Sequence, residues 1–204
     1  MSRTAPSAVA ATISLARPLL GATLFFTLTP STRESATAGI LVAAACASDW
    51  LDGEVARRSG AETRTGRLID NLCDVAFLLF AFAAFARLEL WSPPVWGRFV
   101  RYMDAANWLP LFALVASFGS YAVRVAVDLR AGREPMRSPR GHAAGVLNYL
   151  LVVLGAVELW PGLALGPWVL EPAFLSVDLL NFLAVGENLF LMFPRAGSGP
   201  RMAR

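Results

Sequence analysis

Six long apolar segments cover most of the chain, at lengths close to what a helix needs to cross a bilayer. The protein is 56% hydrophobic and 16% charged, whereas soluble domains are usually about 25% charged. This excess of apolar surface favours lipid over water as the surrounding solvent. We therefore expect an all-α integral membrane protein, a bundle of six transmembrane helices over residues 8–30, 36–51, 70–91, 106–127, 143–162 and 174–193.

The first two segments differ from the others. The first contains Arg17 and Pro18, so we expect an N-terminal interfacial part before the true span begins. The second is short, which favours contact with protein or a polar region rather than with lipid. We expect one catalytic membrane domain over residues 1–194, followed by a short disordered cytoplasmic tail, 195–204.

The arginines indicate how the bundle is oriented. Four fall on one side of the expected spans and twelve on the other, namely Arg3, Arg57, Arg58, Arg64, Arg67, Arg130, Arg133, Arg137, Arg140, Arg195, Arg201 and Arg204. The positive-inside rule then places these twelve and both termini in the cytoplasm, and we expect a multi-pass protein of a prokaryotic cytoplasmic membrane. The net charge of +3 suits anionic lipid. Because no basic face is free of apolar runs, nucleic acid is excluded as a partner.

Four of the seven aspartates lie within residues 49–74. Asp49 and Asp52 are three residues apart, and Asp70 and Asp74 are four apart, so each pair shares one face of a helix. The second and third spans run in opposite directions, so both pairs should meet at the cytoplasmic end. Carboxylates so close together must be neutralised by protons or bind divalent cations, and oxygen ligands suit Mg²⁺ or Mn²⁺.

Small residues and an arginine accompany the aspartates. Gly53, Ala56 and Gly66 permit close helix approach, or let a ligand lie against the backbone. Arg57 adds a planar cation that suits phosphate. Taken singly, such residues also serve as proton relays, ion-pair partners or packing positions. Taken together, they suit a substrate that carries a diphosphate.

The same residues form, without a gap, the pattern D-x-x-D-G-x-x-A-R-x₈-G-x-x-x-D-x-x-x-D over residues 49–74. This stretch resembles the motif of the CDP-alcohol phosphatidyltransferases. Every defining position of that motif is filled, by Asp49, Asp52, Gly53, Ala56, Arg57, Gly66, Asp70 and Asp74. Six spans with the motif at the cytoplasmic end of the second and third are also similar to that family. Outside the motif, the likeness is one of architecture.

The resemblance implies an enzyme of phospholipid biosynthesis in which the hydroxyl of an acceptor alcohol displaces CMP from a CDP-linked donor. It implies that Asp49, Asp52 and Asp70 bind metal. It further implies that Asp74 is the general base and also touches a second metal. Two ions, Mg²⁺ or Mn²⁺, can neutralise a diphosphate and orient in-line attack. The residues implied to contact the CDP part of the donor are Gly53, Arg57 and Thr63.

A second arginine-rich segment, residues 124–142, is the candidate acceptor site. We expect Arg124 and Arg137 to bind a phosphate on the acceptor, although arginines here also serve topology alone. The stretch RSPRGHAAGVLNY faintly resembles a segment of phosphatidylglycerophosphate synthases, with His142 at a lysine position. That likeness favours glycerol 3-phosphate as the acceptor and CDP-diacylglycerol as the donor. Inositol phosphate or another alcohol, and a soluble CDP-alcohol donor, stay open.

Polar residues within the last span have two interpretations. They are functional groups, or they serve helix packing or a homodimer interface; the residues are Asp178, Asn181, Glu187 and Asn188. A different class of function, an ion- or proton-coupled transporter, would place its carboxylates near mid-membrane and show repeated halves. In this sequence the acidic cluster lies at one membrane face and no repeated half is visible. The pattern therefore favours the enzyme.

Overall fold

The structure, a computed structural model, describes residues 4–32, 35–59, 64–91, 107–132 and 138–193. Within these ranges its regular elements are all helices, which confirms the all-α fold class. They are α1 (Thr4–Thr27), the short 3-10 helix η1 (Pro30–Thr32), α2 (Ala36–Ser59), α3 (Arg64–Arg87), α4 (Leu109–Arg130), α5 (Pro139–Glu158) and α6 (Pro167–Met192).

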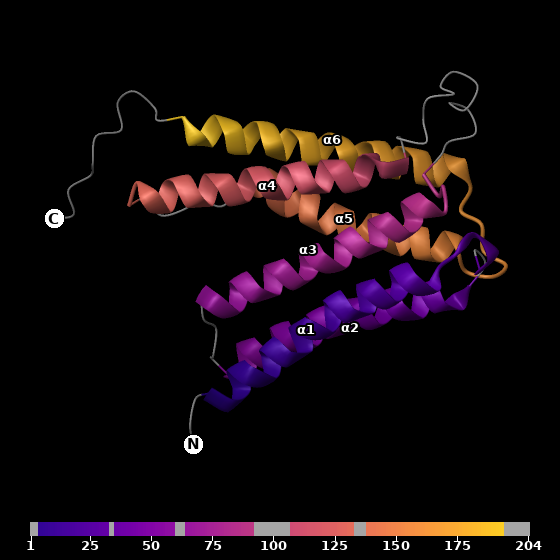
Figure 1. The fold of residues 1–204 in the computed structure, drawn as a ribbon, viewed down its shortest axis with the longest axis horizontal. Helices are drawn as coiled ribbons and strands as arrows, with labels where there is room; N and C mark the ends of the chain where they lie inside the picture. The colour runs from indigo at the N-terminus through magenta and orange to yellow at the C-terminus, as the bar shows by residue number, and fades with distance from the viewer. Residues whose placement is uncertain (1–3, 33–34, 60–63, 92–106, 133–137, 194–204) are drawn as a thin grey trace.

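The α helices lie side by side, and each runs opposite to the one before it (Figure 1). α1 packs on α2 and α3, and α6 packs on α4 and α5, while α3 also contacts α4 and α5. As a result, α1 begins and α6 ends at the same end of the bundle, where α2 ends and α3 begins (Figure 1). This is the arrangement expected of an even number of crossings.

Among the described residues, four helices are long and apolar enough to cross a bilayer, over Leu68–Arg87, Leu109–Arg130, Pro139–Glu158 and Trp168–Met192. α1 has a shorter apolar stretch, Thr12–Thr27. Of the six expected spans, length and composition thus support four directly. Large apolar side chains cover the outside of the bundle: Trp168 is 89% exposed and Phe26 is 73% exposed. A surface of this kind suits lipid, so the chain is a multi-pass membrane protein.

Two helices differ from the expected boundaries. α1 is one continuous helix from Thr4 to Thr27 that includes Pro18. The interfacial position of its first turns stays a prediction. α2 continues to Ser59, about two turns beyond the expected end of its apolar segment. Because hydropathy reports the lipid-facing length and not the helix length, a helix that projects past the membrane is underestimated. Arg57 and Arg58 therefore lie on a helix and not in a loop.

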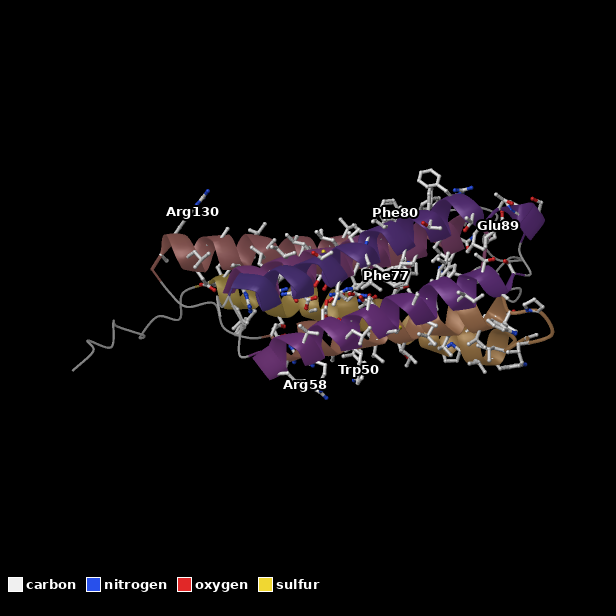
Figure 2. All side chains as sticks on the ribbon, turned by 90° about the horizontal axis from the view of Figure 1, so that it is seen from below. Trp50, Arg58, Phe77, Phe80, Glu89 and Arg130 are labelled. Atoms are coloured by element: carbon white, nitrogen blue, oxygen red, sulfur yellow. The ribbon has the colours of Figure 1, made fainter. Side chains whose placement is uncertain are left out.

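The apolar core fills the half of the bundle away from the aspartates. It is built on buried side chains of α1, α3 and α5, including Leu24, Phe82, Phe85 and Leu151. Across the bundle, Phe77 points inwards, whereas Trp50 and Phe80 point away from it (Figure 2).

Glycine allows one of the closest contacts in this core. A Cβ atom at Gly155 of α5 would lie 2.8 Å from the ring of Phe85 and 3.0 Å from the ring of Trp91. No side chain fits there without displacing these rings, so Gly155 sets the distance between α5 and α3.

Candidate active site

The two aspartate pairs meet where the end of α2 lies beside the start of α3. Carboxylate oxygens of Asp49, Asp70 and Asp74 lie within 4.8 Å of one another. The side chain of Asp49 is 50% exposed and that of Asp70 is 37% exposed, whereas Asp52 is only 5% exposed. The expected convergence of the four aspartates at one end of the bundle is therefore present in the fold. Their roles in binding metal and moving a proton stay predictions.

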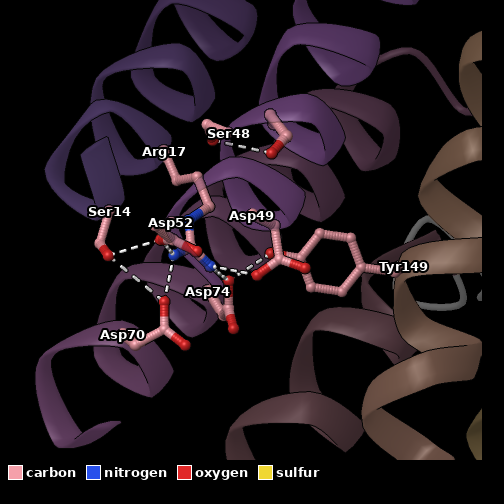
Figure 3. A network of polar contacts seen from close by, with 9 residues as sticks. Ser14, Arg17, Ser48, Asp49, Asp52, Asp70, Asp74 and Tyr149 are labelled. Carbon is pink, nitrogen blue, oxygen red and sulfur yellow. Dashed lines mark hydrogen bonds and ion pairs between the residues drawn. The ribbon is translucent and has the colours of Figure 1, made fainter. Parts of the chain in front are cut away.

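An arginine from α1 lies at the centre of this group and was not expected there. Arg17 is completely buried and forms ion pairs with all four aspartates (Figure 3). Its Nη1 donates to Asp49 at 2.9 Å and to Asp74. Its Nη2 donates to Asp52 and Asp70. The only signal in the sequence was a charged residue inside an apolar segment, which must find a partner.

Ser14, one turn before Arg17, also joins the group. Its hydroxyl lies 2.6 Å from Asp52 and 3.4 Å from Asp70, as hydrogen-bond donor to both (Figure 3). Burial raises the pKa of Asp52 above the ordinary value of a carboxyl group, and the Ser14 hydrogen bond and the Arg17 charge oppose this rise. α1 thus supplies the polar contacts that keep this buried carboxylate within the helix bundle.

The chemistry of the group fits divalent metal. Four carboxylates face a single guanidinium, so negative charge remains in excess. Three of them already bring oxygens within 4.8 Å, and carboxylate oxygens are the ligands that Mg²⁺ and Mn²⁺ prefer. The residues that would hold such ions are Asp49, Asp70 and Asp74, whose oxygens converge, while Asp52 stays a predicted further ligand.

A tyrosine from α5 contacts Asp74 and was also missed. The Tyr149 hydroxyl donates to Asp74 Oδ1 at 2.6 Å (Figure 3). Its ring stacks on Phe77 with centroids 5.8 Å apart and planes at 20°. Phe77 lies one turn after Asp74 on α3, so α3 fixes both the ring and the hydroxyl. No local pattern connects residues 74 and 149, and only the packing of α5 on α3 reveals the pair.

A cavity of about 860 Å³ opens beside Asp49 and Asp74. Residues of α3, α4, α5 and α6 form most of its walls. Its apolar lining comes from residues such as Leu78, Leu114 and Phe118. Its polar lining includes Ser117, Tyr121, His142, Asn148, Tyr149 and Asn181. His142, from the stretch with the faint synthase resemblance, therefore lines this cavity from the first turn of α5.

Polar groups of α6 fasten that helix to its neighbours. The Asn181 and Asn148 amides exchange hydrogen bonds of 3.0 and 3.2 Å between α6 and α5. Asn188 donates to Ser120 of α4 at 3.0 Å. Glu187 accepts from Ser138, the residue that caps α5, at 2.6 Å. Three of the four polar residues singled out in the last span thus have packing contacts, whereas the buried Asp178 carboxylate has no hydrogen-bond partner among the described residues.

The remaining expected site residues are placed as follows. Gly53 is half-buried on α2 next to Asp52. Arg124 is completely buried on α4, with its guanidinium 5.5 Å from the ring centre of Tyr121, which lines the cavity. Arg57 lies on α2, but its side chain is outside the described residues, and so are Thr63 and Arg137 as a whole.

Comparison with known proteins gives one family and one structure. The model of the CDP-alcohol phosphatidyltransferase family matches residues 7–179. No curated protein matches the chain. A crystal structure of phosphatidylinositol phosphate synthase from Mycobacterium tuberculosis, with CDP-DAG bound, is similar at 18% sequence identity and a TM-score of 0.48, over 100% of this chain and 92% of that one. Because the family match extends over most of the chain, this membrane protein belongs to the CDP-alcohol phosphatidyltransferase family.

Proposed function

We propose that this phosphatidyltransferase moves the phosphatidyl group of CDP-diacylglycerol to the hydroxyl of a small polar alcohol, with two Mg²⁺ or Mn²⁺ ions bound at the aspartates. One observation carries the proposal: oxygens of Asp49, Asp70 and Asp74 converge within 4.8 Å, beside a cavity that extends into the bundle. When bound, divalent metal would neutralise the diphosphate of the donor and the CMP that leaves.

Asp74 is the proposed general base. It lines the cavity, so an acceptor hydroxyl inside the cavity can reach its carboxylate. The proton of that hydroxyl passes to Asp74 as the acceptor oxygen bonds to the phosphorus that carries the diacylglycerol. The bond from this phosphorus to the oxygen of CMP breaks, and CMP leaves with the electron pair. Asp49, Asp52 and Asp70 are the proposed metal ligands.

The donor binds from the α2 side of the centre. Gly53 lies next to Asp52 and offers bare backbone against which the CDP part can rest. Arg57 and Thr63 are its further proposed contacts. CDP-diacylglycerol is favoured over a soluble donor because apolar side chains surround the bundle on the outside and give acyl chains a matching environment.

The acceptor binds in the cavity, and glycerol 3-phosphate is the proposed acceptor. His142 lines the cavity, and Arg124 contacts the ring of Tyr121 in its wall. Both groups can supply positive charge to a phosphate, as can Arg137. Inositol phosphate carries the same phosphate and is the second candidate. The arginine distribution supports a cytoplasmic position for this centre.

The test is a CMP-release assay on the purified protein in detergent. CDP-diacylglycerol and Mg²⁺ are supplied with glycerol 3-phosphate, inositol phosphate, free inositol, glycerol or serine, and CMP and the lipid product are identified by mass spectrometry. We expect CMP and one new lipid with glycerol 3-phosphate. A lipid product formed only with another alcohol would correct the acceptor. Absence of CMP with every alcohol, and with a soluble CDP-alcohol as donor, would refute the proposed reaction.

A further inference from the structure

The contacts of Arg17 link the two helices that carry the aspartates. Nη1 bridges Asp49 of α2 to Asp74 of α3, and Nη2 bridges Asp52 of α2 to Asp70 of α3. Each amino group thus takes one carboxylate from each helix. The four carboxylates that Arg17 contacts are the same ones that the proposed function assigns to divalent metal.

Among the described residues, the buried charge of Arg17 is balanced by these four carboxylates. Its side chain is completely buried, and its Nε has no hydrogen-bond partner among the described residues. A guanidinium in such surroundings depends on the carboxylates it contacts. The carboxylates depend on it in turn, because without a cation they would repel one another.

We propose that Arg17 is the built-in counter-cation of the metal-free centre, and that divalent metal binds by displacing it from the four aspartates. The proposal rests on the proposed function, in which these carboxylates hold metal. Arg17 and the metal ions compete for the same oxygens, and like charges at such short range repel strongly. Arg17 therefore holds the ligands together before metal arrives and lowers the apparent affinity of the site for metal.

Whether loss of Arg17 tightens or weakens metal binding follows from two populations: molecules in which Arg17 contacts the carboxylates and molecules in which it has released them. Metal binds only those molecules in which Arg17 has released the carboxylates, so the apparent Kd is the intrinsic Kd divided by that fraction. Removing the guanidinium makes the fraction one. If Arg17 occupies the site in at least nine molecules of ten, its removal tightens metal binding by about tenfold or more. A residue that instead positioned the ligands around the metal would have the opposite effect.

The experiment measures Mn²⁺ binding to the whole protein in detergent without substrates, by the loss of the free Mn²⁺ signal in electron paramagnetic resonance. The variants are Arg17→Gln, Arg17→Lys and, as a charge-matched control, Arg87→Gln. Arg87 ends α3, about 20 Å along the helix from Asp74, and contacts Phe25. Thermal unfolding of each protein is followed with and without Mn²⁺.

We expect Arg17→Gln to bind Mn²⁺ about tenfold tighter than the wild type or better, with a lower Tm in the absence of metal and a larger rise in Tm when metal is added. Arg17→Lys should tighten binding less, because one ammonium group still occupies part of the site. Arg87→Gln should bind as the wild type does.

Unchanged or weaker Mn²⁺ binding by Arg17→Gln would overturn the proposal. If that variant cannot be purified even with Mn²⁺ present, Arg17→Lys decides in its place, and unchanged or weaker binding again overturns it. Such a result together with CMP release by the wild type would leave the proposed function standing. A wild type that binds no divalent metal would overturn both.

Discussion

Replacing Tyr149 with phenylalanine removes one hydroxyl and leaves the aromatic ring in place. In the wild type this hydroxyl donates to Asp74 at 2.6 Å, while the ring stacks on Phe77 at 5.8 Å. The stacking contact survives in Tyr149→Phe, so the packing of α5 on α3 is expected to persist. The change therefore isolates the hydrogen bond that orients the proposed base.

The size of the effect follows from the strength of that bond. A hydrogen bond to a charged group contributes about 1.5–3 kcal/mol, and each 1.4 kcal/mol of barrier is about tenfold in rate. If this energy holds the Asp74 carboxylate in its reactive orientation, kcat should fall between about tenfold and a hundredfold. The KM for the donor should stay unchanged, because the proposed donor contacts lie on the α2 side of the centre.

The assay is steady-state CMP release, with kcat and both KM values measured alongside Tm. Thr23→Val is a matched control, because it removes an exposed hydroxyl of α1 that bonds only within its own helix in the structure. A kcat for Tyr149→Phe within about twofold of the wild type, at equal Tm, would refute a positioning role. So would an equal loss of activity in Thr23→Val.

Three further predictions test other parts of the account. Asp74→Asn should abolish CMP release yet retain binding of CDP-diacylglycerol, measured by equilibrium titration; substantial turnover would remove Asp74 as the base. Chelation of divalent metal should stop CMP release, and added Mg²⁺ or Mn²⁺ should restore it; full activity in chelator would contradict the metal assignment. Gly155→Ala should lower the free energy of unfolding by about 1–3 kcal/mol because its Cβ would lie 2.8 Å from Phe85. Gly145→Ala should not, since apart from the adjoining backbone of α5 no described atom lies within 4 Å of its Cβ. Equal Tm values for the two variants would refute the close-packing explanation.

Much of the architecture was predictable because it depends on local sequence. Apolar runs of helix length predicted the membrane class. Successive helices that each cross the membrane must also alternate in direction. The spacing of Asp49 with Asp52, and of Asp70 with Asp74, set which faces of α2 and α3 carry carboxylates. Helix ends were less predictable, since α2 extends beyond the apolar run that identified it.

Only the tertiary structure revealed the partners of the aspartates. Arg17 lies 32 residues before Asp49, and Tyr149 lies 75 residues after Asp74. Which side chains of α1 and α5 reach these carboxylates depends on how each helix is rotated and where it crosses its neighbours. The spacing of residues along a single helix does not predict its rotation or where it crosses its neighbours.

The four aspartates and the family motif were therefore determined by the sequence alone, since both are properties of one continuous stretch, residues 49–74. The buried arginine between the carboxylates, the tyrosine on Asp74 and the cavity beside it were decided by the packing of six helices. The physical reason is that a charge inside an apolar segment must be neutralised by whatever the fold brings to it, and helix packing selects that partner.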